Sequence, residues 1–543
     1  DAMPPVSQWS GTPAIKGSTE SMRMALLTLV LVGLQFTWGI EMTYCTPYLL
    51  QLGLTKSRIS LVWVAGPLSG LIMQPVVGVI ADRSKSKWGR RRPFMVGGTV
   101  VVSLCLLVLG WTKEIVASFV TEVELRKSCT ITLAVLSIYA VDFAINAVQG
   151  SCRSLIVDTL PISKQQMGSS WASRMVAVGH LIGYGAGALD LGKIFGPTLG
   201  DTQFKQLTAI AAIALCVTVG TTCWAVTERV LISDGKDAQG EIGAVETVTQ
   251  ILKTATSLPP RIAAICFVQF WSWIGWFPFL FYSTTWVGEI YLRYDAPVEA
   301  RQSDDTLGQV GRIGSMALIA FSTITFACSV MLPWFVEAPQ DEKPGFTPRP
   351  PTRLAPMLIE LEKYKPTLLT TWMISHCIFA GSMILAPFVT SLHGATVLVS
   401  WAITCWAPFT FMGVEINKIS TAGNGHSYGH LNRDSIELEA GSSPVLHLAH
   451  FPDETPASTG EGSGVYLGIL NLYTTLPQFV GTFISWAVFS ILEPGKSPEL
   501  AKEAHPDEHH STDGPNGIAV CLFIGAISAV VAAYATTRLR HIH

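Results

Sequence analysis

The sequence predicts an all-α integral membrane protein built from two bundles of six helices. The chain has 543 residues, of which 49% are hydrophobic and only 14% are charged, whereas a soluble globular protein carries about a quarter charged residues. Its apolar residues fall into blocks of roughly 20, the length with which an α-helix crosses the hydrocarbon of a bilayer. A polar stretch at 227–260 separates six of these blocks from six more.

The apolar blocks define twelve membrane spans, with edges that are set to within a few residues. The spans are placed at 25–50, 59–81, 94–112, 130–155, 172–192, 207–226, 261–283, 312–336, 368–390, 395–415, 464–491 and 516–537. The expected domains are a cytoplasmic tail (1–22), an N-terminal bundle (23–227), a central cytoplasmic linker (228–260) and a C-terminal bundle (261–543). Two polar segments at 337–367 and 416–463 are expected to be flexible cytoplasmic insertions.

The loop after the second span sets the expected orientation. It reads RSKSKWGRRRPF at 83–94 and carries six Lys and Arg within twelve residues. Positive charge in a short loop keeps that loop on the cytoplasmic side of the membrane. We therefore expect this loop and both chain termini to lie in the cytoplasm.

The sequence contains no motif for ATP use or for enzymatic chemistry. GALDLGKI at 187–194 repeats part of a phosphate-binding loop, but Ile194 stands where that loop needs Ser or Thr. Zinc-ligand helices, nucleophile elbows and dinucleotide-binding fingerprints are missing too, so we expect no catalytic residue, no metal site and no cofactor. HPDEHH at 505–510 is interpreted as a solvated loop in preference to a metal site. A net charge of −3 gives no argument for binding nucleic acid.

Span four carries polar side chains where lipid would otherwise be. Asp142, Asn146, Gln149 and Arg153 are spaced by 4, 3 and 4 residues, so they form one stripe on a helix of 3.6 residues per turn. A charge near the middle of a span costs at least about 2.5–3.5 kcal/mol on insertion scales, and such residues usually face a cavity. The stripe therefore favours a functional site, the alternative being a polar network that only holds helices together.

The chemistry of these side chains suggests separate roles. A carboxyl group in an apolar cavity can bind a proton on one side of the membrane and release it on the other, because burial disfavours its charged form. Arginine stays charged and cannot do this. We therefore assign proton transfer to Asp142. Asn146, Gln149 and Arg153 offer the donors and acceptors that sugar hydroxyls need.

Other spans add weaker candidates. Gln35 and Glu41 lie in span one, His180 lies in span five, and Arg312 begins span eight; Trp276 and Phe277 of span seven could stack on a sugar ring. Each has a structural alternative: Arg312 could reach the membrane surface, His180 could be a core histidine, and the rings could form an aromatic core or interface belt. Span five also repeats glycine at 179, 183 and 187, a spacing with which membrane helices approach closely.

Six segments in order carry a resemblance to a known family. They are TPYLLQLGL (46–54), GPLSGLIMQPVVGVIADR (66–83), WGRRRPF (88–94), QGSCRSLIVD (149–158), GWFPFLFYSTTWVGEIY (275–291) and LGILNLYTTLPQ (467–478). Together they resemble the plant sucrose–proton symporters and the animal proton-associated sugar transporters. Those proteins are of the glycoside–pentoside–hexuronide type within the major facilitator superfamily. The segments lie in both halves of the chain, so the resemblance covers nearly all of it.

The resemblance implies a central sugar site between two bundles, proton coupling by Asp142, and a symporter of sucrose or a related α-glucoside. It matches Arg153 and Arg312 to the family's arginines in spans four and eight. It also implies a cytoplasmic gate, which comprises Asp82, Arg83, Gly89, Arg90 and Arg91. The family's usual place is the plasma membrane, and a monomer suffices for its architecture.

The sequence departs from the plant members at three places. Glu41 stands where they have Gln, as in animal members; His180 stands where they tend to have Asn; and the 416–463 insertion is unlike theirs. These departures bear on the choice of sugar more than on proton coupling, because Asp142 is retained. The alternative functions are a sugar facilitator or exporter without proton coupling and a sugar sensor that signals through its long loops.

Overall fold

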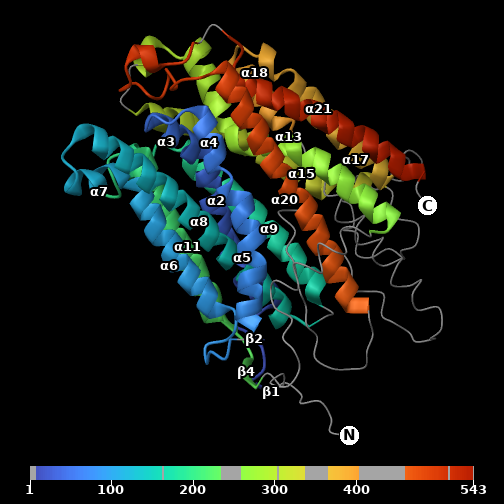
Figure 1. Cartoon of the computed structure of the whole chain (residues 1–543). Helices are drawn as coiled ribbons and strands as arrows, with labels where there is room; N and C mark the ends of the chain where they lie inside the picture. Colours follow the sequence, from blue (N-terminus) through green and yellow to red (C-terminus); the bar gives the residue numbers. More distant parts are fainter. Residues whose placement is uncertain are drawn as a thin grey trace.

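The protein is made of long helices arranged in two bundles, as the computed structural model in Figure 1 shows. The structure describes residues 8–82, 84–161, 164–233, 258–301, 305–336, 365–402, 459–511 and 514–541. The first bundle comes from the blue-to-green half of the chain and the second from the green-to-red half. This arrangement agrees with the predicted all-α membrane protein of two bundles.

The N-terminal bundle contains six membrane-length helical runs. The first comprises α1 (Glu20–Thr28), α2 (Val30–Ile40), the π-helical turn η1 (Glu41–Cys45) and α3 (Thr46–Gln51). The others are formed by α4 (Lys56–Val62) with α5 (Ala65–Asp82), α6 (Arg92–Gly110), α8 (Val123–Thr159), α9 (Gln165–Ala188) and α11 (Gln203–Ala225). Short helices α7 (Thr112–Phe119) and α10 (Leu191–Phe195) connect them.

The C-terminal bundle contains five such runs among the described residues. Its elements are α13 (Pro260–Ile290), η3 (Tyr291–Asp295), α14 (Val298–Arg301), α15 (Thr306–Phe335), α17 (Leu368–Ile384), η5 (Ala386–Phe388), α18 (Leu392–Ser400), α20 (Thr459–Leu492), η6 (Pro506–Glu508), α21 (Gly517–Arg538) and η7 (Leu539–His541). The five runs are formed by α13, α15, α17, α20 and α21. Within this bundle α21 lies against both α13 and α17.

Ten helices of the described residues are long and apolar enough to cross a membrane. Two of the twelve predicted spans are not among them. The span predicted at 172–192 is the helix α9, which is less apolar because it carries Gln, Ser, Arg and His side chains. The span predicted at 395–415 begins as α18, but its residues beyond 402 lie outside the described residues. Residues 337–364 and 403–458, which contain most of the two predicted insertions, also lie outside the described residues.

Two short antiparallel sheets tie the start of the chain to the end of the first bundle. β1 (Gln8–Ser10) pairs with β4 (Val230–Ser233), and β2 (Ala14–Ile15) pairs with β3 (Val226–Thr227). These strands can pair only if the chain enters and leaves the bundle at the same end. An even number of membrane-length helices brings the chain back to that end. These short strands are not part of the all-α fold that the sequence predicts.

The glycines of α9 allow close helix packing, as their spacing predicts. A β-carbon at Gly179 or Gly183 would press against the α2 backbone, at Val32 and Phe36 respectively. A β-carbon at Gly187 would collide with Ser315 of α15, in the other bundle. One face of α9 therefore packs inside its own bundle and its last turn packs across the bundle boundary.

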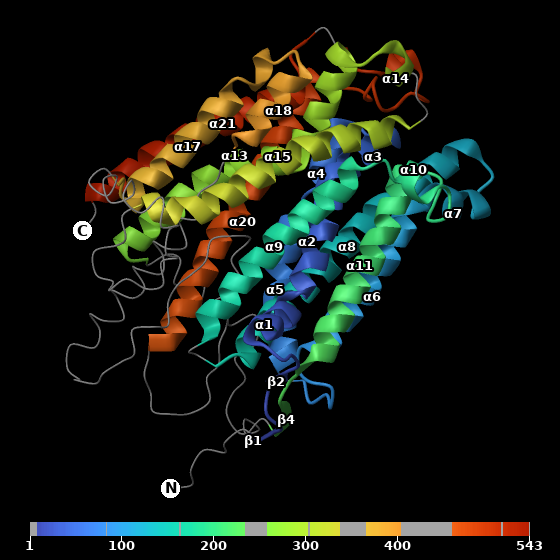
Figure 2. The same cartoon turned by 180° about the vertical axis from the view of Figure 1, so that it is seen from behind.

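The two bundles meet at the end of the molecule opposite β1, which we call the closed end (residues 42–66, 281–301, 305–315, 485–511 and 514–516). There Thr46 Oγ1 donates a hydrogen bond to the Phe281 carbonyl (3.0 Å), and Tyr282 donates to Ser60 Oγ (3.1 Å). Away from this end the bundles splay apart, as both views show (Figures 1 and 2). The molecule is thus held together at one end and separated at the other.

Candidate functional site

The predicted polar stripe of α8 lies on a buried face of the N-terminal bundle. Asp142 is 0% exposed, Asn146 and Gln149 are also buried, and Arg153 is half-buried one turn beyond them. The helical period places these side chains on one face, as the spacing predicts, and α5, α6 and α9 pack around α8. The stripe therefore faces protein and not lipid over most of its length.

Asn146 connects α8 to α5 through a small hydrogen-bond network. Its amide nitrogen donates to Ser69 Oγ (2.9 Å) and to the carbonyl of Asp142 (3.0 Å), while Gln74 donates to its amide oxygen (3.3 Å). Ser69 donates in turn to the Gly66 carbonyl (2.8 Å). Ser69 and Gln74 were not predicted as site residues. Asn146 thus has a structural role in this state, whichever ligand it also contacts.

Glu41 and Asp142 form a pair of buried neighbouring carboxyl groups. Glu41 is only 4% exposed and belongs to the π-helical turn η1, a distortion that is frequent at functional sites. The two groups are close enough to interact electrostatically. Within the described part of the chain, none of their four oxygens accepts a hydrogen bond from a third residue. Two acidic groups are thus buried side by side with no described donor to neutralise them.

A cavity of about 10 Å³ lies next to Glu41, on the side of α6 and α11. Its lining is apolar apart from Glu41, Cys45 and Thr208. A space of this size holds about one water molecule and is far too small for a sugar. A sugar that contacts the carboxyl pair must therefore approach from another side.

Gln35 and His180 lie close together on neighbouring helices of the same bundle. The Gln35 side chain packs against Gly179 of α9, directly before His180. The His180 ring stacks on Tyr184 with the ring centroids 5.7 Å apart. The structure therefore places the predicted polar candidates of α2, η1, α8 and α9 within one bundle.

The remaining predicted site residues belong to the C-terminal bundle. The Trp276 ring lies 4.8 Å from the Phe279 ring and 6.1 Å from the Phe321 ring, so it is part of an aromatic cluster. Phe277 is 0% exposed and packs on Phe281. In this state both rings therefore lie in an aromatic core, which is the structural alternative to stacking on a sugar ring.

Arg312 lies at the closed end, where its Nη1 is 3.3 Å from the Asp305 carboxylate. Burial raises the pKa of Asp305, and the charge of Arg312 opposes that rise. Asp190 lies beyond the end of α9, and its pKa is lowered first by a hydrogen bond from Lys193 and further by the charge of Arg312. Arg312 therefore acts electrostatically on groups of both bundles.

The predicted gate loop is a compact charged turn. Arg90 Nη2 and Arg91 Nε each lie 2.9 Å from the same oxygen of Asp158, at the end of α8. Gly89 has a φ of +112°, a conformation that side chains rarely adopt. A β-carbon there would also collide with Glu228. The Asp82 side chain and Arg83 lie outside the described residues.

Glu228, which follows α11 and β3, organises this turn and was not predicted. Its carboxylate accepts hydrogen bonds from the backbone N–H groups of Arg90, Arg91 and Arg92, each with an N···O distance of 2.9 Å. Arg92 also donates to the carbonyl of Cys223, near the end of α11. Glu228 follows the sixth span within a charged TER sequence, but nothing in the sequence indicates which loop it contacts.

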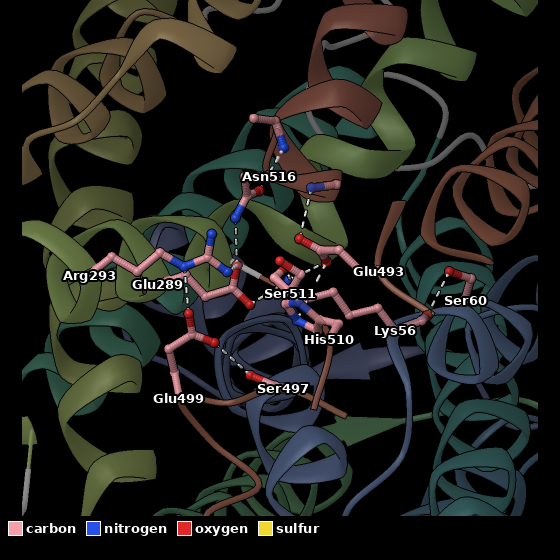
Figure 3. Close-up of polar contacts among 12 residues, drawn as sticks. Lys56, Ser60, Glu289, Arg293, Glu493, Ser497, Glu499, His510, Ser511 and Asn516 are labelled. Atoms are coloured by element: carbon pink, nitrogen blue, oxygen red, sulfur yellow. Dashed lines mark hydrogen bonds and ion pairs between the residues drawn. The ribbon is translucent and has the colours of Figure 1, made fainter. Parts of the chain in front are cut away.

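The closed end holds a buried ionic cluster that sequence analysis also missed (Figure 3). Lys56 Nζ lies 2.7 Å from Glu289 Oε1 and 2.7 Å from Glu493 Oε2. Arg293 lies against Glu499, with 2.5 Å between Nε and Oε1. The only available signal was a set of charges at the ends of predicted spans, and such charges usually lie in solvent.

His510 lies beside this cluster, whereas residues 505–508 of its HPDEHH segment are exposed, as the solvated-loop interpretation predicts. The His510 ring is buried, with Nε2 3.9 Å from Glu493 Oε2. The segment folds back because the Lys496 backbone makes two hydrogen bonds, one with Glu508 and one with His510. Among the residues that the structure describes, no group of three His, Cys, Asp or Glu side chains is arranged to hold a metal ion.

The amino-acid sequence is similar to those of known sugar transport proteins. Over 95% of its length the chain is 32% identical to the general alpha-glucoside permease of Schizosaccharomyces pombe, 93% of which is covered. It is 33% identical to sucrose transport protein SUC4 of Arabidopsis thaliana over 50% of this chain and 56% of that protein. Sucrose transport protein SUT1 of Oryza sativa subsp. japonica is 25% identical, with coverages of 84% and 80%. Residues 28–289 match the family described as MFS/sugar transport protein.

Solved structures share the fold at low sequence identity. A D-xylose–proton symporter superposes with a TM-score of 0.52 at 13% identity, covering 95% of this chain and 97% of that one. A bacterial homolog of the human lysosomal transporter Spinster, in an inward-facing conformation, gives a TM-score of 0.52 at 13% identity, with coverages of 97% and 98%. At these identities the similarity concerns the arrangement of helices.

Proposed function

The chain belongs to the MFS family of sugar transport proteins, and on that basis we propose that it is a proton-coupled symporter of sucrose or a related α-glucoside. The names of its relatives support the substrate class, since one is an alpha-glucoside permease and others are sucrose transport proteins. We propose that the coupling ion is the proton and that the coupling residues are Asp142 and Glu41.

The buried Glu41–Asp142 pair is the observation that supports proton coupling. Two carboxylates cannot both remain charged side by side in an apolar interior without a cation or hydrogen-bond donors. A shared proton removes one charge and supplies a hydrogen bond between the groups. The pair thus holds a proton in the state observed here and releases it when a conformational change brings in water or a cation.

For the sugar we propose polar groups on the same helix as Asp142 and on the neighbouring helices of that bundle. Gln149 and Arg153 of α8, with Gln35 and His180 of the neighbouring helices, offer donors and acceptors for hydroxyl groups. Asn146 joins them if a sugar hydroxyl replaces its hydrogen bond from Gln74.

The opposite bundle contributes the second wall of the proposed site. Arg312, Trp276 and Phe277 are the predicted contacts there. Phe277 is fully buried in this state, so its contact with a sugar belongs to another conformation. A site shared between bundles is the arrangement that alternating access requires, because the bundles rock about the bound substrate.

Transport then follows from exchange between two arrangements of the bundles. The observed state is joined at the closed end and splayed at the other. We propose that the gate loop with Gly89, Arg90 and Arg91, together with Asp82 and Arg83, helps to close the splayed end in the opposite state. We assign the splayed end and both termini to the cytoplasm and place the protein in the plasma membrane as a monomer.

Reconstituted protein tests the proposal directly. Proteoliposomes with an inside-alkaline pH gradient are given labelled sucrose, with maltose and glucose as competitors. We expect accumulation above the outside concentration that a protonophore abolishes, and we expect Asp142→Asn to equilibrate sugar without accumulating it. Asp507→Asn is the matched control, because that carboxyl is 89% exposed. Accumulation by Asp142→Asn would refute the assignment, and protonophore-insensitive equilibration by the parent would identify a facilitator.

A further inference from the structure

The ionic cluster at the closed end crosses the boundary between the bundles through Lys56. This lysine begins α4 of the N-terminal bundle, whereas Glu289 of α13 and Glu493, just after α20, belong to the C-terminal bundle. The lysine is 2% exposed, and both carboxylates are buried as well. The ion pairs thus exist only while the bundles are in contact at this end.

Both carboxylates are held by their own bundle independently of Lys56. Asn516 donates to Glu289 Oε2 (2.8 Å), and the Gly517 backbone N–H donates to Glu493 Oε1 (3.0 Å). Their positions are therefore fixed at the start of α21, one oxygen of each being turned toward Lys56 (Figure 3). When the bundles separate, the carboxylates stay in place and the lysine leaves.

Lys56 is positioned from its own side. The Thr55 side chain caps α4 by accepting a hydrogen bond from the backbone N–H of Arg58. Ser60 Oγ donates a hydrogen bond to the Lys56 carbonyl (3.0 Å). Tyr282 of the other bundle donates to that same Ser60 hydroxyl (3.1 Å). The first turn of α4 therefore meets the C-terminal bundle through both a charge and a hydroxyl.

The charge balance at the closed end makes closure more favourable with Lys56 than without it. The C-terminal bundle brings Glu289, Glu493 and Glu499 to this cluster with Arg293 as its cation. Without Lys56, closure would bury Glu289 and Glu493 with less positive charge than they need, and uncompensated buried charge is strongly unfavourable. In an open state, by contrast, water can solvate the same carboxylates.

We propose that Lys56, Glu289 and Glu493 form an ionic latch that holds the closed end shut, and that the latch must break in every transport cycle. Lys56 is thus a positioning residue for the conformational change and not a sugar or proton ligand. The inference rests on the alternating-access part of the proposed function. It depends neither on the identity of the sugar nor on proton coupling.

A buried reporter cysteine measures opening at this end. Thr284 lies between the bundles, where its hydroxyl donates to the Met42 carbonyl (3.1 Å), so Thr284→Cys reacts with a polar maleimide only when the closed end opens. The labelling rate is measured in nanodiscs without sugar or pH gradient, and labelling of the native cysteines is subtracted. We expect Lys56→Gln to accelerate labelling by about tenfold or more and Lys56→Arg to leave it near the parental rate.

Lys205 supplies the matched control. It is also a buried lysine between two carboxylates, Glu114 and Asp201, but these carboxylates are exposed and all three residues belong to the N-terminal bundle. Lys205→Gln should therefore leave the labelling rate unchanged. Equal acceleration by Lys56→Gln and Lys205→Gln would show general loosening and overturn the latch, as would parental labelling of Lys56→Gln.

Two further variants keep the test decisive if Lys56→Gln does not fold. Glu289→Gln removes one arm of the latch and should accelerate labelling by a smaller factor. Lys56→Glu combined with Glu493→Lys restores opposite charges and should label more slowly than Lys56→Glu alone. Failure of both expectations overturns the latch. Because labelling needs no substrate, failed sugar accumulation with intact latch behaviour would count against the proposed function only.

Discussion

Asp142 of α8 and Glu41 of η1 lie next to each other in the interior of the N-terminal bundle, and their four oxygens accept no hydrogen bond from any other described residue. Acidic groups in such surroundings are stable only with a proton or a cation. Asn146 on the same stripe is instead bonded to α5. In this state the stripe therefore combines a carboxyl that has no hydrogen-bond donor outside the Glu41 pair with an amide that is fully engaged by α5 and its own helix.

Replacing Glu41 tests whether the two carboxyls act together. The amide of a glutamine side chain can donate a hydrogen bond to an ionised Asp142, so Glu41→Gln should let Asp142 remain charged without its proton. We expect this variant to equilibrate sugar at close to the parental rate but to accumulate less of it. Counterflow and gradient-driven uptake measured in the same proteoliposomes distinguish the two effects. Parental accumulation would show that Asp142 needs no second carboxyl.

Asn146→Ala should affect both stability and sugar binding. The change removes the hydrogen bonds that Asn146 makes with Ser69 and Gln74, and an unsatisfied buried polar group costs about 1–3 kcal/mol. We expect a lower unfolding temperature in detergent together with a higher KM for sugar. Ser69→Ala is the control, because it removes one of the two hydrogen bonds between α5 and Asn146 but leaves the Asn146 amide. A KM that rises equally in both variants would assign Asn146 to packing alone.

Gly89→Ala should destabilise the gate loop. Alanine at a φ of +112° is strained by about 1–3 kcal/mol, and its β-carbon would displace Glu228. We expect a lower unfolding temperature and a lower transport rate. Gly97→Ala serves as control, since a β-carbon at that α6 position meets nothing within 4 Å and alanine favours a helix by up to about 1 kcal/mol. Equal stability of the two variants would contradict the account of the loop.

Glu228→Ala should release the same loop without backbone strain. Three backbone N–H groups lose their acceptor, and Arg92 loses a carboxylate 3.5 Å from its Nε. We expect faster limited proteolysis at Lys85 and Lys87, which precede the turn. Glu228→Gln keeps an accepting oxygen and should be cleaved nearly as slowly as the parent. Unchanged cleavage of Glu228→Ala would mean that the Asp158 contacts alone hold the loop.

Local regularities explain what the sequence could predict. Hydropathy blocks locate most of the helices, because length and apolar content decide membrane insertion. The helical period places Asp142, Asn146 and Gln149 on one buried face, and the glycine spacing of α9 predicts its close contacts. These features depend on residues near each other in the chain.

Features that depend on distant residues could not be predicted. Lys56 meets Glu289 and Glu493 only because two bundles dock, and no local pattern distinguishes these charges from solvated ones at span ends. The tail strands β1 and β2 are too short to show a pattern and exist because residues 226–233 pair with them. His510 is buried because its segment folds back on Lys496, a contact that the HPDEHH composition does not indicate.

The central claim is that Asp142 carries the proton that moves with the sugar, and proton movement itself is its most direct test. Proteoliposomes that enclose a pH-sensitive dye are given sucrose without an imposed gradient, and the internal pH is followed for the parent and for Asp142→Asn. The account predicts sugar-induced acidification of the lumen in the parent and none in Asp142→Asn, although that variant still equilibrates labelled sucrose. Sugar-induced acidification of the same size in Asp142→Asn would contradict it.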